Sequence, residues 1–207
     1  MAFIKNTSPI VASLTVKNAS DELPILLDKL HHSLAETRRW AARDLLAYPS
    51  ATGALVERLK IEADISVREI ILTSLTRLGG SVAVNGLVDC LRSEDACMRN
   101  EAIAAMKSLP VEVSPIMDSL LVDDDADVRI MAVNILESLM HPHVEKWLID
   151  VIELDSVTNV CGTAVDLLGE VGTKDCMPAL LNLKKRFAEE PYIQFATDLA
   201  ISRIAKD

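Results

Sequence analysis

The sequence predicts an all-α protein, an α-α superhelix of about six helical hairpins stacked in a row. One pattern recurs at intervals of 30, 31, 30 and 32 residues. It is an apolar residue, usually followed by arginine, with apolar residues again four and seven positions further on. Units of this size cannot bury their own apolar face and must stack on their neighbours. The pattern starts at Thr37, Val67, Met98, Val128 and Val160.

Composition and helix-breaking residues support the same fold. Half of the residues are apolar, but only two Trp, two Tyr and three Phe are present, so leucine, isoleucine, valine, alanine and methionine must fill the interior. Residues that stop helices recur in phase with the apolar pattern and mark the turn inside each hairpin. These turns are Tyr48-Pro49-Ser50, Gly79-Gly80, Leu109-Pro110, His141-Pro142 and Gly169 to Gly172.

We expect one repeat domain over residues 1–207. Residues 1–35 form a degenerate N-terminal capping unit that includes a short helix over residues 9–17, and residues 36–190 form five regular repeats. Residues 191–207 form a closing helix with Phe195, Leu199 and Ile204 facing inward. Capped ends of this kind favour a monomer.

The charge balance excludes several classes of function. A net charge of −10 opposes attraction to a phosphate backbone, so we expect no nucleic acid as partner. The first residues lack the pattern of a signal peptide, and no apolar run reaches the roughly 18 residues of a membrane span. The four cysteines show no paired framework. A reduced, cytoplasmic location without membrane attachment is therefore expected.

The last repeat resembles HEAT repeats of the short bacterial type, a type also found in phycobilisome lyase subunits. The resemblance covers roughly residues 36–190 and implies a solenoid of paired helices, each pair made of a first (A) and a second (B) helix. The residues that carry it best are Val160-Cys161-Gly162-Thr163-Ala164-Val165-Asp166-Leu167-Leu168-Gly169-Glu170-Val171-Gly172, followed by Met177-Pro178-Ala179-Leu180-Leu181.

The resemblance also implies a ladder of hydrogen bonds between units, made by an aspartate before each A helix and an arginine at its second position. At the last repeat Cys161 replaces the arginine and Asp155 is displaced, so we expect looser stacking there. The arginine column could instead bind phosphate, but its recurring acidic neighbours favour the ladder. The matching pairs are Asp64 with Arg68, Asp95 with Arg99, and Asp125 with Arg129.

No catalytic or cofactor site is predicted. The acidic run from Asp123 to Asp127 lacks the glycine and the distal glutamate of a calcium loop and is better explained by a solvated turn whose acids cap a helix. His141 and His143 have no cysteine at ligand spacing. The cysteines fall within apolar helical patterns, which indicates buried thiols. Deoxyhypusine hydroxylase, a metal-binding relative of HEAT type, carries His-Glu pairs that this sequence lacks.

The B helices of a solenoid ordinarily line its concave side, which makes their outward positions the predicted binding surface. Counted from Gly53 and its equivalents, positions one, four and seven give a mainly acidic stripe with a basic patch near the carboxyl end. The predicted partner-binding residues are Glu57, Asp89, Arg92, Ser119, Trp147, Asp150, Glu153, Asn182 and Lys185.

The two tryptophans have different expected roles. Trp147 lies at an outward B position and resembles an interface anchor, although it could instead fold back as partial core. Trp40 is expected to be a packing residue near the start of the array.

The sequence therefore predicts a non-catalytic adaptor without cofactor that binds another protein along its acidic B face. A partner with a basic segment or helix would complement this surface. The alternative, which follows from the resemblance alone, is an accessory subunit of a bilin lyase or another cofactor-insertion chaperone.

Overall fold

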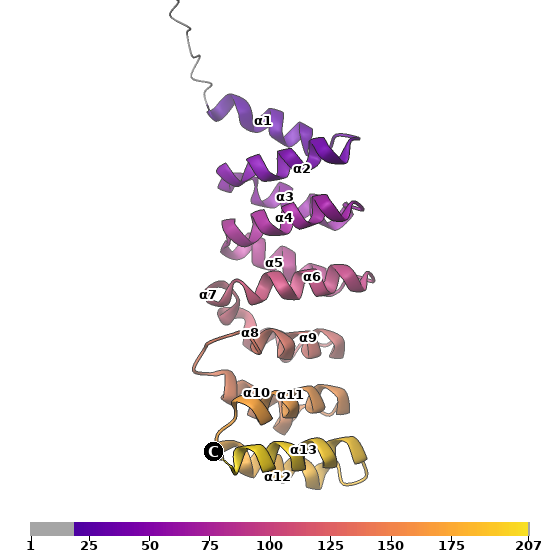
Figure 1. Ribbon diagram of the computed structural model, residues 1–207, viewed down its shortest axis with the longest axis vertical. Helices are drawn as coiled ribbons and strands as arrows, with labels where there is room; N and C mark the ends of the chain where they lie inside the picture. Colours follow the sequence, from indigo (N-terminus) through magenta and orange to yellow (C-terminus); the bar gives the residue numbers. More distant parts are fainter. Residues whose placement is uncertain (1–18, 207) are drawn as a thin grey trace, which may run out of the picture.

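The structure, a computed structural model, describes residues 19–206, and within that range it contains helices and no strand. Helices of two kinds alternate along the chain (Figure 1). The A helices are α2 (Ala35–Asp44), α4 (Ile65–Leu78), α6 (Ala96–Lys107), α9 (Ala126–Leu136), α11 (Thr158–Val171) and α13 (Pro191–Ile204). The B helices are α1 (Ala19–Lys29), α3 (Thr52–Ile61), α5 (Gly80–Leu91), α7 (Pro110–Val113) with η3 (Ser114–Ile116) and α8 (Met117–Leu120), α10 (Val144–Leu154) and α12 (Met177–Arg186).

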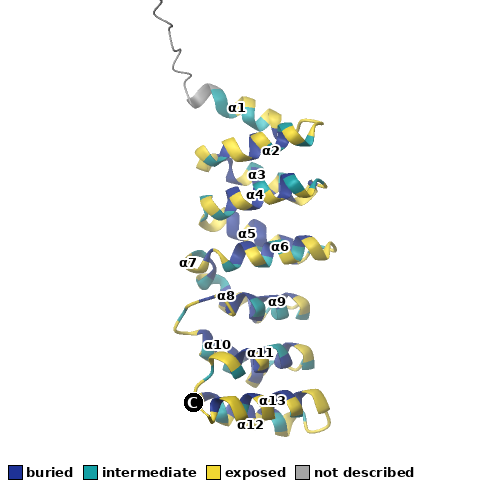
Figure 2. Cartoon of the chain, viewed as in Figure 1, coloured by how far each residue is buried: buried dark blue, intermediate teal, exposed yellow. Residues whose placement is uncertain are grey.

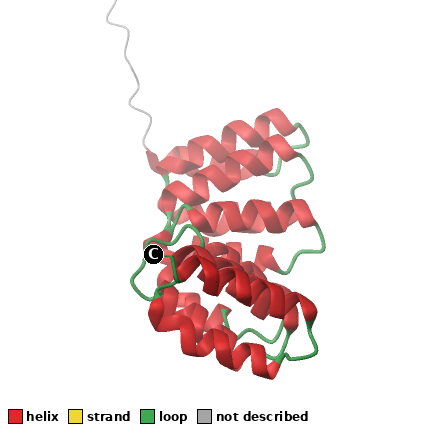
Figure 3. Ribbon diagram, turned by 60° about the horizontal axis from the view of Figure 1, so that its bottom comes forward, coloured by secondary structure: helices red, strands yellow, loops and turns green. Residues whose placement is uncertain are grey.

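The helices form two layers. Each A helix contacts the next A helix, from α2 on α4 to α11 on α13, and the B helices pack in a second row, with α3 on α5 and α10 on α12. Figure 3, a view turned by 60°, shows rows of helices with the loops at their ends. Short turns η1 (Leu45–Ala47), η2 (Pro49–Ala51) and η4 (Lys174–Cys176) complete the connections. The predicted all-α superhelix is confirmed.

The core lies between the two layers, where buried residues are concentrated (Figure 2). Aliphatic side chains at the repeating positions fill it, and burying each one contributes about 1.5–3 kcal/mol. The start of the A pattern is fully buried at Val67, Val128 and Val160. The equivalent B positions are also fully buried, and they are Leu55, Leu87, Met117, Leu148 and Leu180.

Local signals set the ends of the helices. Asp64, Asp95 and Asp125 each accept a backbone hydrogen bond two residues further on, and so cap α4, α6 and α9. Gly79 and Gly80 have φ values of 62° and 77°, a left-handed conformation that only glycine adopts at little cost, and they turn the chain from α4 into α5.

The fourth B helix is broken into α7, η3 and α8. Pro110 begins α7, where a proline without a donor is tolerated, but Pro115 lies inside the segment. Its ring would clash with a carbonyl one turn earlier and it cannot donate a helical hydrogen bond, so the helix is interrupted there. This B element is therefore shorter and less regular than its neighbours.

The ends of the stack differ from the expected arrangement. The predicted helix over residues 9–17 lies outside the described residues. The closing helix is α13, in which Ile204 is buried as predicted, but Phe195 is 69% exposed and Leu199 is also exposed. The inward assignment of these two residues is wrong, because Ile193, Ala196, Thr197 and Ala200 occupy the face of α13 that packs on the preceding unit.

The arginines of α4 and α9 each tie their unit to the next, so hydrogen bonds between units form as predicted. Each arginine, however, bonds an acid of the following unit and not the Asp64 or Asp125 with which it was matched. Arg68 donates to Asp95 at 2.8 Å, and Arg129 donates to Asp155 at 2.6 Å and 3.2 Å. Each acid lies in the linker that precedes the following A helix. Asp155 lies two residues before Val157, the N-cap of α11, so it is displaced as expected, but it is still part of the ladder.

The first rung is the most deeply buried. The Glu62 side chain is 0% exposed and accepts from Arg38 at 2.7 Å, from Arg58 at 2.9 Å and from the backbone of Asp64 at 2.9 Å. Burial alone would raise the pKa of Glu62, but these hydrogen bonds outweigh it and lower the pKa to about 2. Glu62 is thus ionised inside the protein.

At the joint between α6 and α9 the arginine of the ladder does not come from the A helix. Arg99 donates to the carbonyl of Ser93 at 2.6 Å, and among the described residues it forms no ion pair with Asp125. Arg92, which was predicted to bind a partner, donates to Asp123 instead. The rung is retained, but its arginine is more exposed than Arg38, Arg68 and Arg129.

A substitution of the same kind occurs at the last repeat. The Cys161 thiol lies 3.3 Å from the carbonyl of Asp155, the position that an arginine would reach. Arg186 on α12 donates to that carbonyl at 2.6 Å and lies 3.5 Å from the Cys161 sulfur. The guanidinium is thus supplied from the next B helix, which accounts for the missing arginine of α11.

Candidate partner-binding face

The predicted stripe lies on the outer side of the B helices, and most of its members are accessible. Asp150 is half-buried and Trp147 is buried. The exposed members are Glu57, Asp89, Arg92, Ser119, Glu153, Asn182 and Lys185.

Lysines of the same face interleave with the carboxylates. Lys60 lies 3.1 Å from Glu57 and 2.9 Å from Asp89, and these hydrogen bonds raise the pKa of Lys60. Lys146 contacts Asp150 at 2.5 Å. Because two carboxylates share Lys60, the surface near α3 and α5 keeps a negative excess. The stripe is acidic, but its negative charge is smaller than its own residues indicate, because neighbouring lysines partly neutralise the carboxylates.

Trp147 is not an exposed anchor. Its side chain is 6% exposed, and its Nε1–H donates to Asp118 Oδ1 at 2.6 Å. His141 stacks on the indole with ring centroids 4.9 Å apart, and His143 meets it edge-on at 5.7 Å. A buried indole requires an acceptor for its N–H, and Asp118 of the preceding B helix supplies one. The alternative in which Trp147 folds back as partial core is the correct one.

A groove lies beside Trp147, between α8 and α10, where the B face meets the linkers that follow these helices. We name it the Trp147 groove; it has a volume of about 590 Å³. Val122 and Leu154 are 71% and 79% exposed and form apolar parts of its wall. Its size is in the range of ligand-binding pockets.

Carboxylates outnumber cations in the Trp147 groove. Arg129 is its only lining cation among the described residues, and Asp155 pairs with it. Outside the lining, Arg92 holds Asp123 and lowers the pKa of that carboxyl, and Lys146 holds Asp150. Asp118 remains, with the indole as its hydrogen-bond donor. The lining carboxylates are Asp118, Asp123, Asp150 and Asp155.

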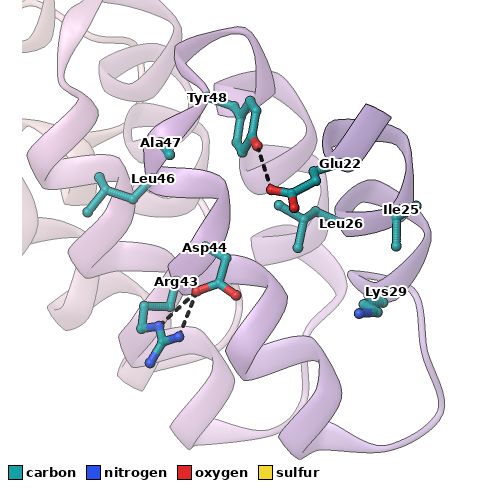
Figure 4. Close-up of a pocket in the computed structure, with 9 residues that line it drawn as sticks. All are labelled: Glu22, Ile25, Leu26, Lys29, Arg43, Asp44, Leu46, Ala47 and Tyr48. Atoms are coloured by element: carbon teal, nitrogen blue, oxygen red, sulfur yellow. Dashed lines mark hydrogen bonds and ion pairs between the residues drawn. The ribbon is translucent and has the colours of Figure 1, made fainter. Parts of the chain in front are cut away.

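A second hollow of about 650 Å³ lies at the N-terminal end, between α1 and the end of α2. Figure 4 shows Arg43 pointing to Asp44, with hydrogen bonds of 3.0 Å and 2.7 Å, and Tyr48 pointing to Glu22 at 3.4 Å. With Lys29, the lining carries two cations and two carboxylates, so this hollow has no charge excess.

Trp40 lies near that hollow and is 46% exposed. The Arg43 guanidinium lies over its ring, 4.2 Å from the centroid, and Arg39 lies at 5.9 Å. The expected role of Trp40 as a packing residue is therefore wrong. It is a surface indole whose face is covered by arginine.

Residues 23–107 match the family model for HEAT repeats. This part of the chain consists of HEAT repeats. Beyond residue 107 the same A and B hairpins continue the stack to α13. No curated protein matches the chain in sequence.

Several solved structures are similar in fold to this chain. Human deoxyhypusine hydroxylase in complex with glycerol is 17% identical, over 91% of this chain and 75% of that chain, with a TM-score of 0.47. The complex of CpcE and CpcF of phycocyanin lyase from Nostoc sp. PCC7120 is 18% identical, over 98% and 100%, with a TM-score of 0.37. Computationally designed armadillo repeat proteins for modular peptide recognition are 18% identical, over 87% and 99%, with a TM-score of 0.43.

The acidic run from Asp123 to Asp127 has a structural explanation. Asp125 caps α9 by accepting from the backbone of Asp127 at 2.9 Å, and Asp123 holds Arg92. Within residues 19–206 no group of three His, Cys, Asp or Glu side chains is arranged to hold a metal ion. No helix of that range is both long and apolar enough to cross a bilayer.

Cys90, Cys161 and Cys176 are buried as predicted, but Cys97 is exposed, so the prediction is wrong there. The buried thiols are poor nucleophiles. Burial raises the pKa of Cys90 and Cys176 to about 11, and it also raises the pKa of Cys161. Because the thiolate is the reactive form, these side chains are unreactive near neutral pH.

Sequence reasoning missed Asp118, Val122 and Leu154. Asp118 adjoins Ser119 in the predicted stripe, and it lies 29 residues before Trp147, close to the repeat interval. A comparison of neighbouring B helices could therefore have paired the acid with the indole. Val122 lies at position seven counted from Pro115, but it is apolar and was left out because the residues chosen at that position were charged. Leu154 lies one position beyond Glu153, at the end of α10.

Proposed function

We propose that this HEAT-repeat protein is a non-catalytic scaffold that binds a partner protein along its B-helix face, and that the partner presents a basic segment or helix. One observation carries the proposal: carboxylates lie at equivalent places on successive B helices. Glu57 on α3 and Asp89 on α5 are exposed at the fourth position, and Asp118 on α8 lies one residue before it.

The spacing of the helices supports a periodic partner. Packed helices lie about 8–10 Å apart. A polyproline II segment rises about 3.1 Å per residue with three residues per turn, so basic residues at every third position lie on one side and meet successive B helices. On a helix, with a rise of about 1.5 Å, positions seven apart have the same separation. A rigid stack of helices can thus bind a segment with regularly spaced basic residues without any enzymatic step.

The carboxyl end of the face limits where such a partner binds. Lys185 is exposed on α12, and Arg186 lies beside it, while Lys184 is paired with Asp198 at 2.5 Å. Like charges repel a basic segment from α12. The proposed binding region therefore runs from α3 to α10, over Glu57, Asp89 and the Trp147 groove.

The test compares two charge-reversed proteins with the wild type as bait. One carries Glu57→Lys and Asp89→Lys on the B face. The matched control carries Glu69→Lys and Glu170→Lys, which are exposed on the A helices and change the net charge equally. Captured proteins are quantified by mass spectrometry, and thermal melting checks that all three proteins are folded.

We expect at least one basic protein to be captured by the wild type and the control and to be lost with the B-face variant. Its capture should also weaken as salt is raised, because the contacts are exposed ion pairs. Equal capture by all three baits, or equal loss with both variants, contradicts the proposal.

A further inference from the structure

The Trp147 groove combines an apolar wall with carboxylates, the two features that a lysine side chain requires. A lysine buries its four-carbon stem against apolar surface and keeps its ammonium on polar acceptors. Val122 and Leu154 offer the apolar surface, and both side chains are largely exposed. Asp118 and Asp150 line the same groove.

The remaining acceptors are single oxygens on two different residues. Asp118 Oδ1 accepts from the indole of Trp147, and Asp150 Oδ2 accepts from Lys146. Over residues 19–206, the second oxygen of each carboxylate has no hydrogen-bond donor. Such separate acceptors suit an ammonium, whose three donors diverge.

A guanidinium is less suited to this groove. Its planar fork binds best to both oxygens of one carboxylate. The carboxylates in the groove that are held in this way, Asp123 and Asp155, already bind Arg92 and Arg129 through both oxygens. The acceptors left open therefore discriminate between the two basic side chains.

We infer that the Trp147 groove binds a lysine side chain of the basic partner, with the stem on Val122 and Leu154 and the ammonium on Asp118 and Asp150. This inference rests on the proposed function, since it names the residue that the B-helix face recognises.

Lys146 acts as a competitor within the chain. Its side chain is 69% exposed and holds Asp150 from the rim of the groove. An exposed ion pair of this kind is weak and exchanges readily with solvent. An incoming ammonium on the open oxygen of Asp150 is repelled by the Lys146 ammonium on the other oxygen, so removal of Lys146 should strengthen binding.

The two indole N–H signals in a ¹H–¹⁵N NMR spectrum provide the readout, because the chain has two tryptophans. The probe is n-butylammonium chloride, which has the shape and charge of a lysine side chain. n-Butanol and an equal concentration of sodium chloride are the controls. We expect a saturable shift of the Trp147 signal, with a Kd in the millimolar range typical of so small a ligand, and no shift of the Trp40 signal.

Substitutions test each acceptor. Asp118→Asn keeps an oxygen for the indole N–H, so it removes charge without removing that hydrogen bond, and Asp150→Asn does the same at the second acceptor. Each should weaken binding at least fivefold, and Lys146→Gln should strengthen it severalfold. The matched control is Asp28→Asn, an exposed acid at the end of α1, which should change nothing. Melting curves confirm folding.

Pentapeptides with one lysine or one arginine among alanines complete the test, and the lysine peptide should bind more tightly. An unchanged Trp147 signal with n-butylammonium, equal binding by Asp118→Asn and the wild type, or tighter binding of the arginine peptide overturns the inference. If the groove fails while capture still depends on Glu57 and Asp89, the scaffold proposal stands. If the groove binds the probe while no capture depends on those residues, the scaffold proposal fails.

Discussion

The two hollows of the molecule are similar in size but differ in how their charges are balanced. At the N-terminal hollow, Arg43 lies between Asp44 and the ring of Trp40, so the chain supplies its own cation to the acid and to the aromatic face. In the Trp147 groove, Asp118 binds the indole N–H and forms no ion pair among the described residues, while Lys146 acts on it only at longer range. The difference suggests that an open carboxylate, rather than the volume of a hollow, marks a site for a basic partner.

Sequence distance explains why the hollows differ. Arg43 and Asp44 are neighbours on α2, so the cation is fixed beside its acid by the chain itself. Asp118 and Trp147 come from successive B helices, and burial of the indole commits one oxygen of that acid. The charge of Asp44 is thus balanced by its neighbour in sequence, whereas the charge in the Trp147 groove depends on how two units stack.

Removal of each tryptophan should give the largest difference between the regions. Trp147→Ala removes a buried indole and should lower the free energy of unfolding by about 3–5 kcal/mol. Trp40→Ala removes an exposed ring and should lower it by less than about 1 kcal/mol. Urea unfolding followed by circular dichroism measures both.

Trp147→Phe serves as an intermediate case, because it keeps much of the ring volume but loses the donor to Asp118. Its effect should fall between those of the two alanine variants. Equal losses for Trp40→Ala and Trp147→Ala would mean that the exposed indole also supports the stack.

Acid should weaken the N-terminal part of the stack through its buried rung. The folded pKa of Glu62 is about 2, below its ordinary value of 4.5, so its stabilisation is fully present above pH 4.5. That stabilisation is lost as pH falls from 4.5 towards 2, and it amounts to about 2–3 kcal/mol. Unfolding free energies measured between pH 6 and pH 2.5 check this.

Glu62→Gln is the control, since it cannot titrate. The variant should be less stable than the wild type at pH 6, because Arg38 and Arg58 lose their counter-charge, and its stability should fall less steeply with acid. Parallel pH profiles for the two proteins would show that another group dominates acid unfolding.

The smallest expected effect comes from making the N-terminal hollow resemble the groove. Arg43→Gln leaves Glu22 and Asp44 against Lys29, which gives a negative excess, and uncovers the ring of Trp40. Stability should change by less than about 0.5 kcal/mol, because the Arg43–Asp44 pair is exposed. n-Butylammonium should now shift the Trp40 NMR signal weakly. No shift at any concentration would mean that charge excess alone does not create a site.

The fold could be predicted from sequence because its cause is periodic. An apolar residue every 30 to 32 positions has to be buried by stacking, and Val67, Val128 and Val160 are fully buried as this requires. The register of the repeats also predicted correctly that Glu57 and Asp89 are exposed on the B helices.

The site was harder to predict because its contacts join different units. The position of Trp147 on α10 suggested that its side chain points outward. Its actual direction depends on the broken B helix of the preceding unit, where Asp118 on α8 accepts the indole hydrogen bond. Trp40 was predicted to pack in the interior, but it lies on the surface with Arg43 over its ring. Helical spacing predicts which face of a helix a residue occupies, while the neighbouring side chains determine whether that residue is buried.

The exposed rung between α6 and α9 has a consequence for motion. Arg92 and Asp123 hold this joint, and Asp123 also lines the Trp147 groove, whose walls α8 and α10 belong to the units on either side. Bending of the helix stack at this joint would change the width of the groove. A bound side chain that contacts both α8 and α10 would oppose this bending, so binding at this single site would determine the stiffness of the whole stack.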